Sequence, residues 1–223
     1  MTSPREVVPV IMGLVEPTSL LDVGCGTGTW LKAFEEAGVS DYVGVDGDYV
    51  NRLQLNIPIG KFIAKDLRTQ WLLNRKFDLV LSLEVAEHLP EASADQFVET
   101  LVSHTDNTII FSAAIPGQGG QNHLNEQWPE YWQQKFMKHG FYFYDVIRPL
   151  IWDNEKVDWW YKQNIFLVTT KYADSQILKS IHPALFKFKL NKMREERESI
   201  ENGVLGIRYS LNLLFKSIIR LGK

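Results

Sequence analysis

The sequence contains only one cysteine, Cys25. It has no run of 18 apolar residues, and it does not start with a basic segment followed by a long apolar one. One cysteine excludes an intrachain disulfide and a zinc site made of thiolates. The lack of a long apolar run argues against a membrane-spanning helix. The first residues, MTSPREVVPV, lack the pattern of a secretory signal, so we expect a cytoplasmic protein.

Histidine is also scarce, with five residues and no H-x-x-x-H pair, so we predict no metal site. One alternative stays open, in which acidic and histidine side chains from two segments converge on Mg2+. These side chains are Glu84, Glu87, His88, His123 and Glu126.

Acidic residues outnumber basic residues in most of the chain, and basic residues outnumber acidic ones only in its last part. Residues 1–170 hold 13 Lys and Arg against 22 Asp and Glu, a formal charge of −9, whereas residues 171–223 hold 11 against 5, a charge of +6. An acidic body is a poor partner for a phosphate backbone, so we expect no nucleic-acid substrate. With 223 residues, 45% hydrophobic and 23% charged, the chain suits one globular α/β domain at 1–172 and an appendage at 173–223.

Short apolar strands alternate with helical patterns along the first 170 residues. Strands are expected at 19–23, 42–45, 62–64, 77–83, 108–113, 141–148 and 164–170, and helices at 4–14, 29–37, near 48–53, 92–104 and near 130–139. We expect Ser3 to cap the first helix and Asp48 the short one, and the last two strands to pair as a hairpin. The alternation predicts a doubly wound, mainly parallel seven-stranded sheet with an antiparallel final strand. Ligands bind such sheets beyond the carboxyl ends of the strands.

A glycine-rich turn follows the first strand, in the segment LLDVGCGTGTW. Gly24, Gly26 and Gly28 alternate there, and glycine lets a backbone turn sharply and approach a ligand closely. The dinucleotide fingerprint G-x-G-x-x-G needs a glycine at position 29, where the chain has Thr29, so that pattern is not matched. A ligand-binding loop and a purely structural turn are the two interpretations.

With Asp22 leading it, the pattern Asp-x-Gly-x-Gly-x-Gly resembles the first motif of class I S-adenosylmethionine-dependent methyltransferases. The resemblance continues through YVGVD, AKDLR and FDLVLSLEVAEHLP and spans about residues 18–170. The last string is similar to the fourth motif of small-molecule O-methyltransferases, including those of quinone biosynthesis. The resemblance implies a Rossmann-like methyltransferase fold with S-adenosylmethionine as cofactor.

Acidic residues at strand ends are the expected cofactor ligands. Asp46 stands 18 residues after Gly28, where a carboxylate accepts both hydroxyls of a ribose. The resemblance implies that Asp66 holds the adenine amino group and that the backbone of Leu67 meets the ring. The full predicted cofactor set is Asp22, Gly24, Gly26, Gly28, Asp46, Gly47, Asp66, Leu67 and Glu84.

Two histidines are candidate catalytic residues. Transfer from a sulfonium requires a nucleophile aligned with the S–CH3 bond, and a hydroxyl acceptor also needs a general base, for which histidine suits neutral pH. His88 follows the fourth strand on the side where the methyl group would lie, and His123 is the second candidate. For each, anchoring of the next helix is the structural alternative.

The segment 117–132, GQGGQNHLNEQWPEYW, has the glycine content of a mobile loop beside a site. It resembles methyltransferases encoded among genes for surface polysaccharides. We predict that polar and aromatic side chains in and near it contact the acceptor, although aromatic residues commonly serve as core. The predicted acceptor contacts are Glu87, Asn125, Glu126, Tyr131 and Trp159.

Residues 204–221 have an apolar stripe and a basic polar stripe at helical spacing, which predicts an amphipathic helix. Three partners are open for it: the domain itself, a second subunit in a homodimer, and the anionic inner face of a membrane.

These patterns together predict a methyltransferase that acts on a hydroxyl of a small, saccharide-like molecule. Methylation of a quinone-like or amine metabolite and a non-catalytic, cofactor-binding scaffold are the alternatives.

Overall fold

The computed structural model describes residues 2–171, 181–202 and 206–221. The chain divides into two compact units, Met1–Ser180 and Ile181–Lys223. The predicted domain boundary, between 172 and 173, falls outside the described residues.

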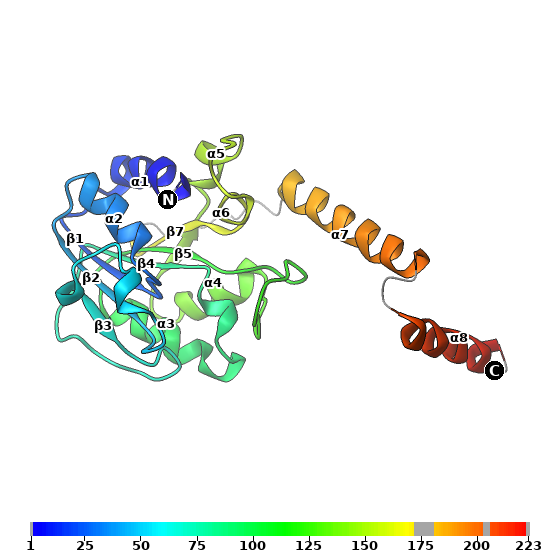
Figure 1. Cartoon of the computed structure of the whole chain (residues 1–223). Helices are drawn as coiled ribbons and strands as arrows, with labels where there is room; N and C mark the ends of the chain where they lie inside the picture. The colour runs from blue at the N-terminus through cyan, green and yellow to red at the C-terminus, as the bar shows by residue number, and fades with distance from the viewer. Residues whose placement is uncertain (1, 172–180, 203–205, 222–223) are drawn as a thin grey trace. The chain divides into compact units, whose positions relative to one another are not determined.

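A seven-stranded sheet forms the centre of the first unit, with the strand order β3-β2-β1-β4-β5-β7-β6 (Figure 1). The neighbours from β3 to β5 pair in parallel, and β7 runs antiparallel to both β5 and β6. The strands are β1 (Ser19–Val23), β2 (Asp41–Asp46), β3 (Phe62–Ala64), β4 (Leu79–Leu83), β5 (Thr108–Ser112), β6 (Tyr142–Tyr144) and β7 (Phe166–Thr169). The structure confirms the predicted class of sheet.

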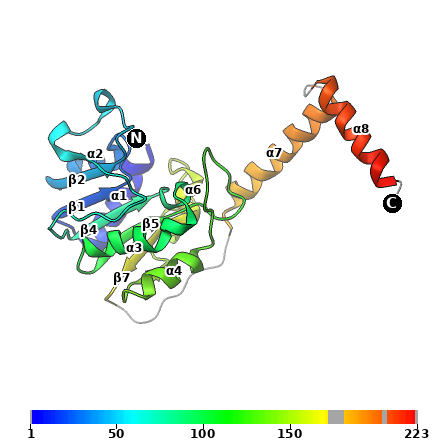
Figure 2. The ribbon, with the colours of Figure 1, turned by 90° about the horizontal axis from the view of Figure 1, so that it is seen from below.

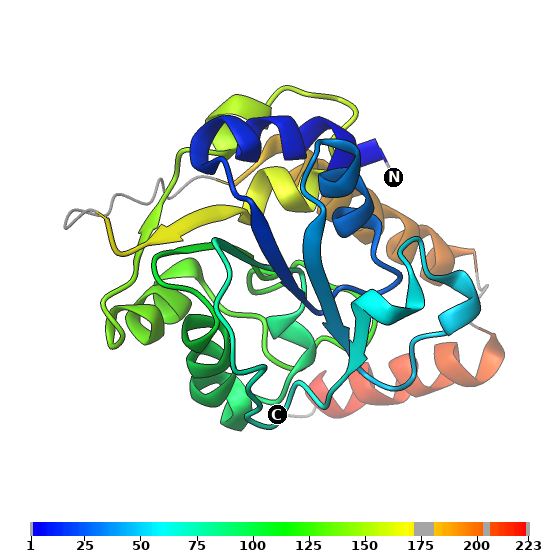
Figure 3. The ribbon, with the colours of Figure 1, turned by 90° about the vertical axis from the view of Figure 1, so that its left-hand side faces the viewer.

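Helices cover both faces of this sheet. The α-helices of the first unit are α1 (Thr2–Val15), α2 (Thr29–Glu36), α3 (Ala94–Ser103), α4 (Pro129–Met137), α5 (Arg148–Ile151) and α6 (Trp159–Asn164). The 3-10 helices are η1 (Arg52–Gln54), η2 (Ile59–Lys61), η3 (Ala86–His88) and η4 (Glu91–Ser93). Helices α1, α2, α5 and α6 lie on one face (Figure 3), and α3 and α4 lie on the other (Figure 2).

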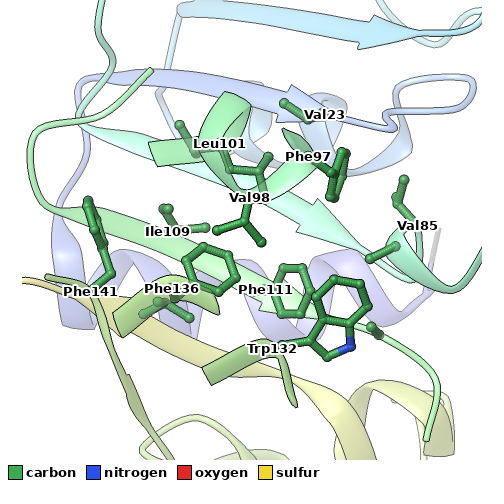
Figure 4. Close-up of a cluster of buried hydrophobic side chains, with 14 of the residues drawn as sticks. Val23, Val85, Phe97, Val98, Leu101, Ile109, Phe111, Trp132, Phe136 and Phe141 are labelled. Carbon is green, nitrogen blue, oxygen red and sulfur yellow. The ribbon is translucent and has the colours of Figure 1, made fainter. Parts of the chain in front are cut away.

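Phe111 of β5 anchors the core between the sheet and the α3–α4 layer. Its ring centroid lies 5.4 Å from that of Trp132 and 5.2 Å from that of Phe136, and both are α4 residues. The ring of Phe143 on β6 is 5.9 Å away. Figure 4 shows this buried cluster, in which Phe111 is only 1% exposed. Because these rings interlock at offset and edge-on angles, the cluster fixes α4 against the sheet.

The prediction that Ser3 caps the first helix is wrong, because Ser3 lies within α1. Its hydroxyl instead donates a hydrogen bond to Asp158 Oδ2 at 2.5 Å and accepts one from the Asp158 backbone N–H at 2.9 Å. The serine therefore joins the start of the chain to the segment before α6. Asp48 does not cap the short helix either: the Asn51 side chain accepts the N–H of Leu53, and Asp48 pairs with Arg52.

The last two strands pair antiparallel, as predicted, but they are shorter, and α5 and α6 lie between them. Arg148, predicted as the end of a strand, begins α5, where its guanidinium pairs with the carboxylate of Asp145. Its Nη1 also donates to the backbone carbonyl of Gln163 at 2.9 Å. This buried ion pair turns the chain away from the sheet after residue 144. The fourth strand also begins later than predicted, at Leu79, and Phe77 forms only an isolated bridge.

The second unit contains α7 (Pro183–Glu201) and α8 (Ile207–Leu221). Helix α8 corresponds to most of the amphipathic helix predicted over 204–221, and residues 204 and 205 lie outside the described part. Across the described ranges, no helix is both long enough and apolar enough to cross a membrane.

We predict that Phe111→Ala lowers the free energy of unfolding by about 3–5 kcal/mol, because it leaves a cavity among three aromatic rings. Urea denaturation followed by circular dichroism measures the change. Leu53→Ala is the matched control, because Leu53 is 95% exposed, and it should change stability by less than about 0.5 kcal/mol. Equal effects of the two substitutions would contradict the central role of the cluster.

Candidate functional site

A cavity of about 1010 Å3 opens at the carboxyl ends of the parallel strands. Its position agrees with the general rule for doubly wound sheets. The residues that line it are Gly24, Asp46, Gly47, Asp48, Tyr49, Ala64, Lys65, Asp66, Leu67, Arg68, Glu84, Val85, His88, Leu89 and Asn122. Seven of the predicted site residues are in this set.

The glycine turn packs closely against its surroundings. Gly24 has φ of +85°, and a Cβ atom there would lie 2.3 Å from a methyl carbon of Val85. Gly28 has φ of +80°, and its added Cβ would lie 2.9 Å from Ile57. Gly26 also has positive φ but has nothing within 4 Å of its Cβ position. Gly24 and Gly28 are therefore required both by their positive φ and by the close packing around them, whereas Gly26 is required by its φ and has open space beside it.

Asp46 ties the glycine turn to the end of β2. Its carboxylate accepts hydrogen bonds from the backbone N–H of Gly26 at 2.7 Å and of Gly47 at 2.6 Å. The hydroxyl of Tyr49 donates to the same carboxylate at 2.6 Å, although the Tyr49 residue is 83% exposed. The turn, the strand end and a surface aromatic side chain thus meet at one carboxylate on the cavity wall.

Asp22 lies beneath the turn, near the end of β1. It is 2% exposed, and its Oδ2 has no hydrogen-bond partner. Burial, helped by the nearby negative charge of Asp46, raises the pKa of Asp22 to about 8. The buried carboxyl is therefore largely protonated at neutral pH.

Asp66 and Leu67 line the cavity after β3. The Asp66 carboxylate accepts bonds from Arg68 Nε at 2.9 Å and Nη2 at 2.8 Å, and from the Arg68 backbone N–H at 2.9 Å. These hydrogen bonds hold the pKa of Asp66 low, at about 2, so the group is ionised. Leu67 is buried against the core on the other side.

Glu84 follows β4 with a φ of +55°, an uncommon conformation for a residue with a side chain. Its backbone N–H donates to the Ser112 carbonyl and hydroxyl, and its carboxylate accepts from Gln118 Nε2 at 3.0 Å and Asn164 Nδ2 at 3.1 Å. Burial raises the pKa of Glu84, against the opposing effect of these hydrogen bonds. A strained backbone and two amide donors hold this carboxyl at the cavity wall.

The two candidate catalytic histidines lie side by side. Their ring centroids are 4.8 Å apart, with His88 at the cavity and His123 in the loop before α4. Burial and the neighbouring His123 lower the pKa of His88. His123 Nδ1 lies 2.8 Å from Glu126 Oε1, and the Glu126 carboxylate also accepts the backbone N–H groups of Gly117 and Gly119 at 2.7 Å. Burial opposes ionisation of Glu126, but these hydrogen bonds outweigh it and lower its pKa.

The predicted acceptor contacts do not line this cavity. Glu87 is fully buried below it, and its backbone carbonyl accepts the N–H groups of Leu124 and Asn125. Asn125 is buried and binds Gln127. Tyr131 packs on the core from α4, and Trp159 begins α6.

Sequence reasoning missed four side chains of the site: Tyr49, Arg68, Gln118 and Asn164. Each binds one of the predicted carboxylates, yet none stands in a motif with a recognised spacing. Arg68 and Tyr49 were accessible in principle, since they are two residues from Asp66 and three residues from Asp46. Gln118 and Asn164 reach Glu84 from a loop and a helix whose course the sequence pattern does not specify.

A family profile described as a methyltransferase domain matches residues 5–159. No curated protein matches the chain. Many solved structures are similar. One is CalS10, an amino pentose methyltransferase from Micromonospora echinaspora with S-adenosylmethionine bound, at 16% identity and a TM-score of 0.55, covering 75% of this chain and 90% of that one.

A second similar structure is magnesium protoporphyrin IX methyltransferase from Synechocystis, also with S-adenosylmethionine bound, at 20% identity and a TM-score of 0.54, covering 75% of this chain and 79% of that one. A third is a putative O-methyltransferase from Nostoc punctiforme, at 16% identity and a TM-score of 0.54, covering 76% of this chain. The chain spans only 56% of that protein's length and 55% of that of DesVI from Streptomyces venezuelae.

At these identities the solved structures establish the fold, and the molecule bound in two of them is the predicted cofactor. The family profile covers well over half of the chain, including the glycine turn, Asp46, Glu84 and both candidate histidines. The chain therefore belongs to the methyltransferase domain family.

Proposed function

We propose that this protein is cytoplasmic and that it transfers the methyl group of S-adenosylmethionine to a hydroxyl of a small molecule, a saccharide or polysaccharide precursor. The observation that carries the proposal is the meeting of the glycine turn, the Asp46 carboxylate and His88 at one cavity. Binding groups for a cofactor and a proton acceptor for a substrate thus lie on the same walls.

The residues present fit the cofactor. Beside Gly26 there is open space, and the buried Oδ2 of Asp22 has no partner, as expected where a ligand completes the turn. Asp46 would receive the ribose hydroxyls, and Asp66 and Leu67 would receive the adenine. When bound, the cofactor supplies a methyl group activated on a sulfonium. Glu84 offers its carboxyl on the same wall.

His88 is the group placed to take the proton of an acceptor hydroxyl. Partial burial of the ring and the neighbouring His123 lower its pKa, so the ring is mainly neutral at pH 7 and has a lone pair available. The pair formed by His123 and Glu126 flanks it and orients the neighbouring loop. The remaining work of the protein is positioning, because a methyl transfer depends on an in-line approach.

The saccharide class of acceptor is supported by the similarity to an amino pentose methyltransferase and by the aromatic side chains outside the cofactor residues. Among these, Trp128 is 50% exposed at the start of α4. A quinone-like acceptor, an amine acceptor and a non-catalytic scaffold are the alternatives. An assay of radiolabelled methyl transfer over sugar, quinone and amine acceptors separates them, and transfer to none of them would favour the scaffold.

We predict that Asp46→Asn weakens binding of S-adenosylhomocysteine by roughly 10- to 100-fold, because a charged hydrogen-bond acceptor is lost from the ribose position. Calorimetric titration measures the affinity. Asp153→Asn, an exposed aspartate outside the cavity, is the control and should bind as the wild type does. If folded wild-type protein does not bind the ligand, the cofactor site proposed here is wrong.

We predict that His88→Ala lowers kcat by roughly 10²- to 10⁴-fold and changes the affinity for S-adenosylhomocysteine by less than about twofold. His139→Ala, an exposed histidine just after α4, is the control. Since protonation removes the lone pair and the pKa of His88 lies below its usual 6.5, kcat should stay level down to about pH 6.5 and fall below that. A loss of folding stability in parallel with activity would instead support a structural role.

We also propose that α8 lies on an anionic membrane surface. Residues 206–223 contain four Lys and Arg and no Asp or Glu. The helix exposes apolar side chains, among them Ile207 at 80% and Phe215 at 65%. A basic polar face beside an apolar face is the pattern of a helix in a lipid interface.

Flotation of the full-length protein with phosphatidylglycerol vesicles tests this. Phe215→Glu should abolish flotation because it places a charge on the apolar face, whereas Asn212→Glu adds the same charge on the polar face and should retain most of it. Equal flotation of both variants, or flotation with neutral vesicles alone, would contradict membrane contact. A dimer in solution that Phe215→Glu dissociates would assign the helix to a second subunit instead.

A further inference from the structure

Three potential metal ligands converge at the edge of the cavity. Glu87 and His88 belong to η3, and His123 comes from the loop before α4, 35 residues further along the chain. One donor atom of each side chain lies within 4.8 Å of those of the other two. Two of the five side chains considered for Mg2+ are engaged elsewhere: Glu84 with Gln118 and Asn164, and Glu126 with His123.

Glu87 is the unusual member of this group. It is 0% exposed, and neither carboxylate oxygen makes a well-formed hydrogen bond. Burial and the nearby Glu84 raise its pKa to about 9, which outweighs the opposing effect of the adjacent backbone N–H groups of Glu87 and Ala114. A buried carboxyl whose two oxygens both lack a well-formed hydrogen bond is rare, and an ion bound there would satisfy them.

Both histidines are oriented as metal-ligating histidines usually are. His123 Nδ1 faces the Glu126 carboxylate at 2.8 Å, which leaves Nε2 as the nitrogen with a lone pair. The backbone of Asn122 offers a hydrogen bond to the His88 ring. Carboxylate and carbonyl partners of this kind fix the tautomer and the ring direction of metal ligands. Glu126 is itself held by two backbone N–H groups, of Gly117 and Gly119.

We propose that Glu87, His88 and His123 bind one divalent transition-metal ion of the zinc class, with Glu126 as the partner that orients His123. Two imidazole nitrogens and one carboxylate are a donor set suited to borderline ions and poorly suited to Mg2+. Ligand atoms around tetrahedral zinc lie roughly 3.4 Å apart, so binding draws the three donors together by at most about 1.4 Å. His88 is an exposed residue whose ring is only partly shielded from solvent, and it ends a short 3-10 helix, so its side chain can make this movement.

The position of this ion would bear on the methyl acceptor. Three protein ligands leave a coordination position open, and His88 faces the cavity. An acceptor hydroxyl bound in that position would lose its proton to water more readily, because a metal ion lowers the pKa of a bound oxygen. The ion would then take over the lone pair of His88 that serves as proton acceptor in its absence. Binding of the ion itself does not rest on the proposed function.

Calorimetric titration of untagged, EDTA-treated full-length protein with ZnCl2 at pH 7.5 tests the site. We expect one Zn2+ per chain with micromolar or tighter affinity, and binding of MgCl2 at least about 100-fold weaker. Co2+ in place of Zn2+ should give the visible absorption bands of a tetrahedral site. Glu87→Gln and His123→Ala should weaken Zn2+ binding at least tenfold, and Glu126→Gln roughly 10- to 100-fold.

His139→Ala is the control and should bind Zn2+ as the wild type does. Glu87→Gln keeps the shape of the buried side chain, so circular dichroism and binding of S-adenosylhomocysteine report whether each variant is folded. Absence of saturable Zn2+ binding by protein that binds S-adenosylhomocysteine would overturn the proposal, as would Zn2+ binding unaffected by Glu87→Gln and His123→Ala. A preference for Mg2+ would overturn the choice of ion. Zn2+ binding by protein that does not bind S-adenosylhomocysteine would leave this site standing and the proposed function refuted.

Discussion

The parallel pairing of β1 between β2 and β4 is the constraint on which the site depends. Asp22 of β1 is in register with Gly44 of β2 and Leu81 of β4, so the three strands end at one edge of the sheet. That edge receives the glycine turn after β1, Asp46 at the end of β2 and Glu84 after β4. Residues more than 20 positions apart in the chain therefore share one cavity wall because of backbone hydrogen bonding.

Close packing then makes the glycine turn specific. Val85, the residue after Glu84, lies where a side chain at Gly24 would have to go, and Ile57 does the same at Gly28. The turn is consequently held against two other segments, and the Asp46 carboxylate fastens its middle through Gly26. Adding even one methyl group at Gly24 or Gly28 would require both a strained φ and a displaced neighbour. The fold therefore requires these two glycines whether or not a ligand is bound.

Electrostatics give this edge of the sheet its chemical character. Asp22 and Glu87 are buried residues and Glu84 is a partly buried one, and burial of the carboxyl is the main cause that raises the pKa of each. Ionising several of them together in a poorly solvated site is unfavourable, and a cationic ligand would relieve that cost. Both ligands proposed for this region carry positive charge, one on a sulfonium and one as a divalent ion.

The sequence by itself determined the succession of strands and helices along the chain and the position of the glycine turn. It also determined that Asp46, Asp66 and Glu84 are acids at strand ends. Hydrophobic periodicity and glycine spacing are local signals, so they can be recognised without the tertiary structure. Tertiary structure decided that Asp145 and Arg148 end β6 early, that Ser3 binds Asp158, and that Tyr49, Gln118 and Asn164 complete the carboxylate contacts. It also brought Glu87 and His88 to His123. Most of these pairings join segments that lie far apart in the chain, and all of them depend on burial and side-chain geometry that no local pattern encodes.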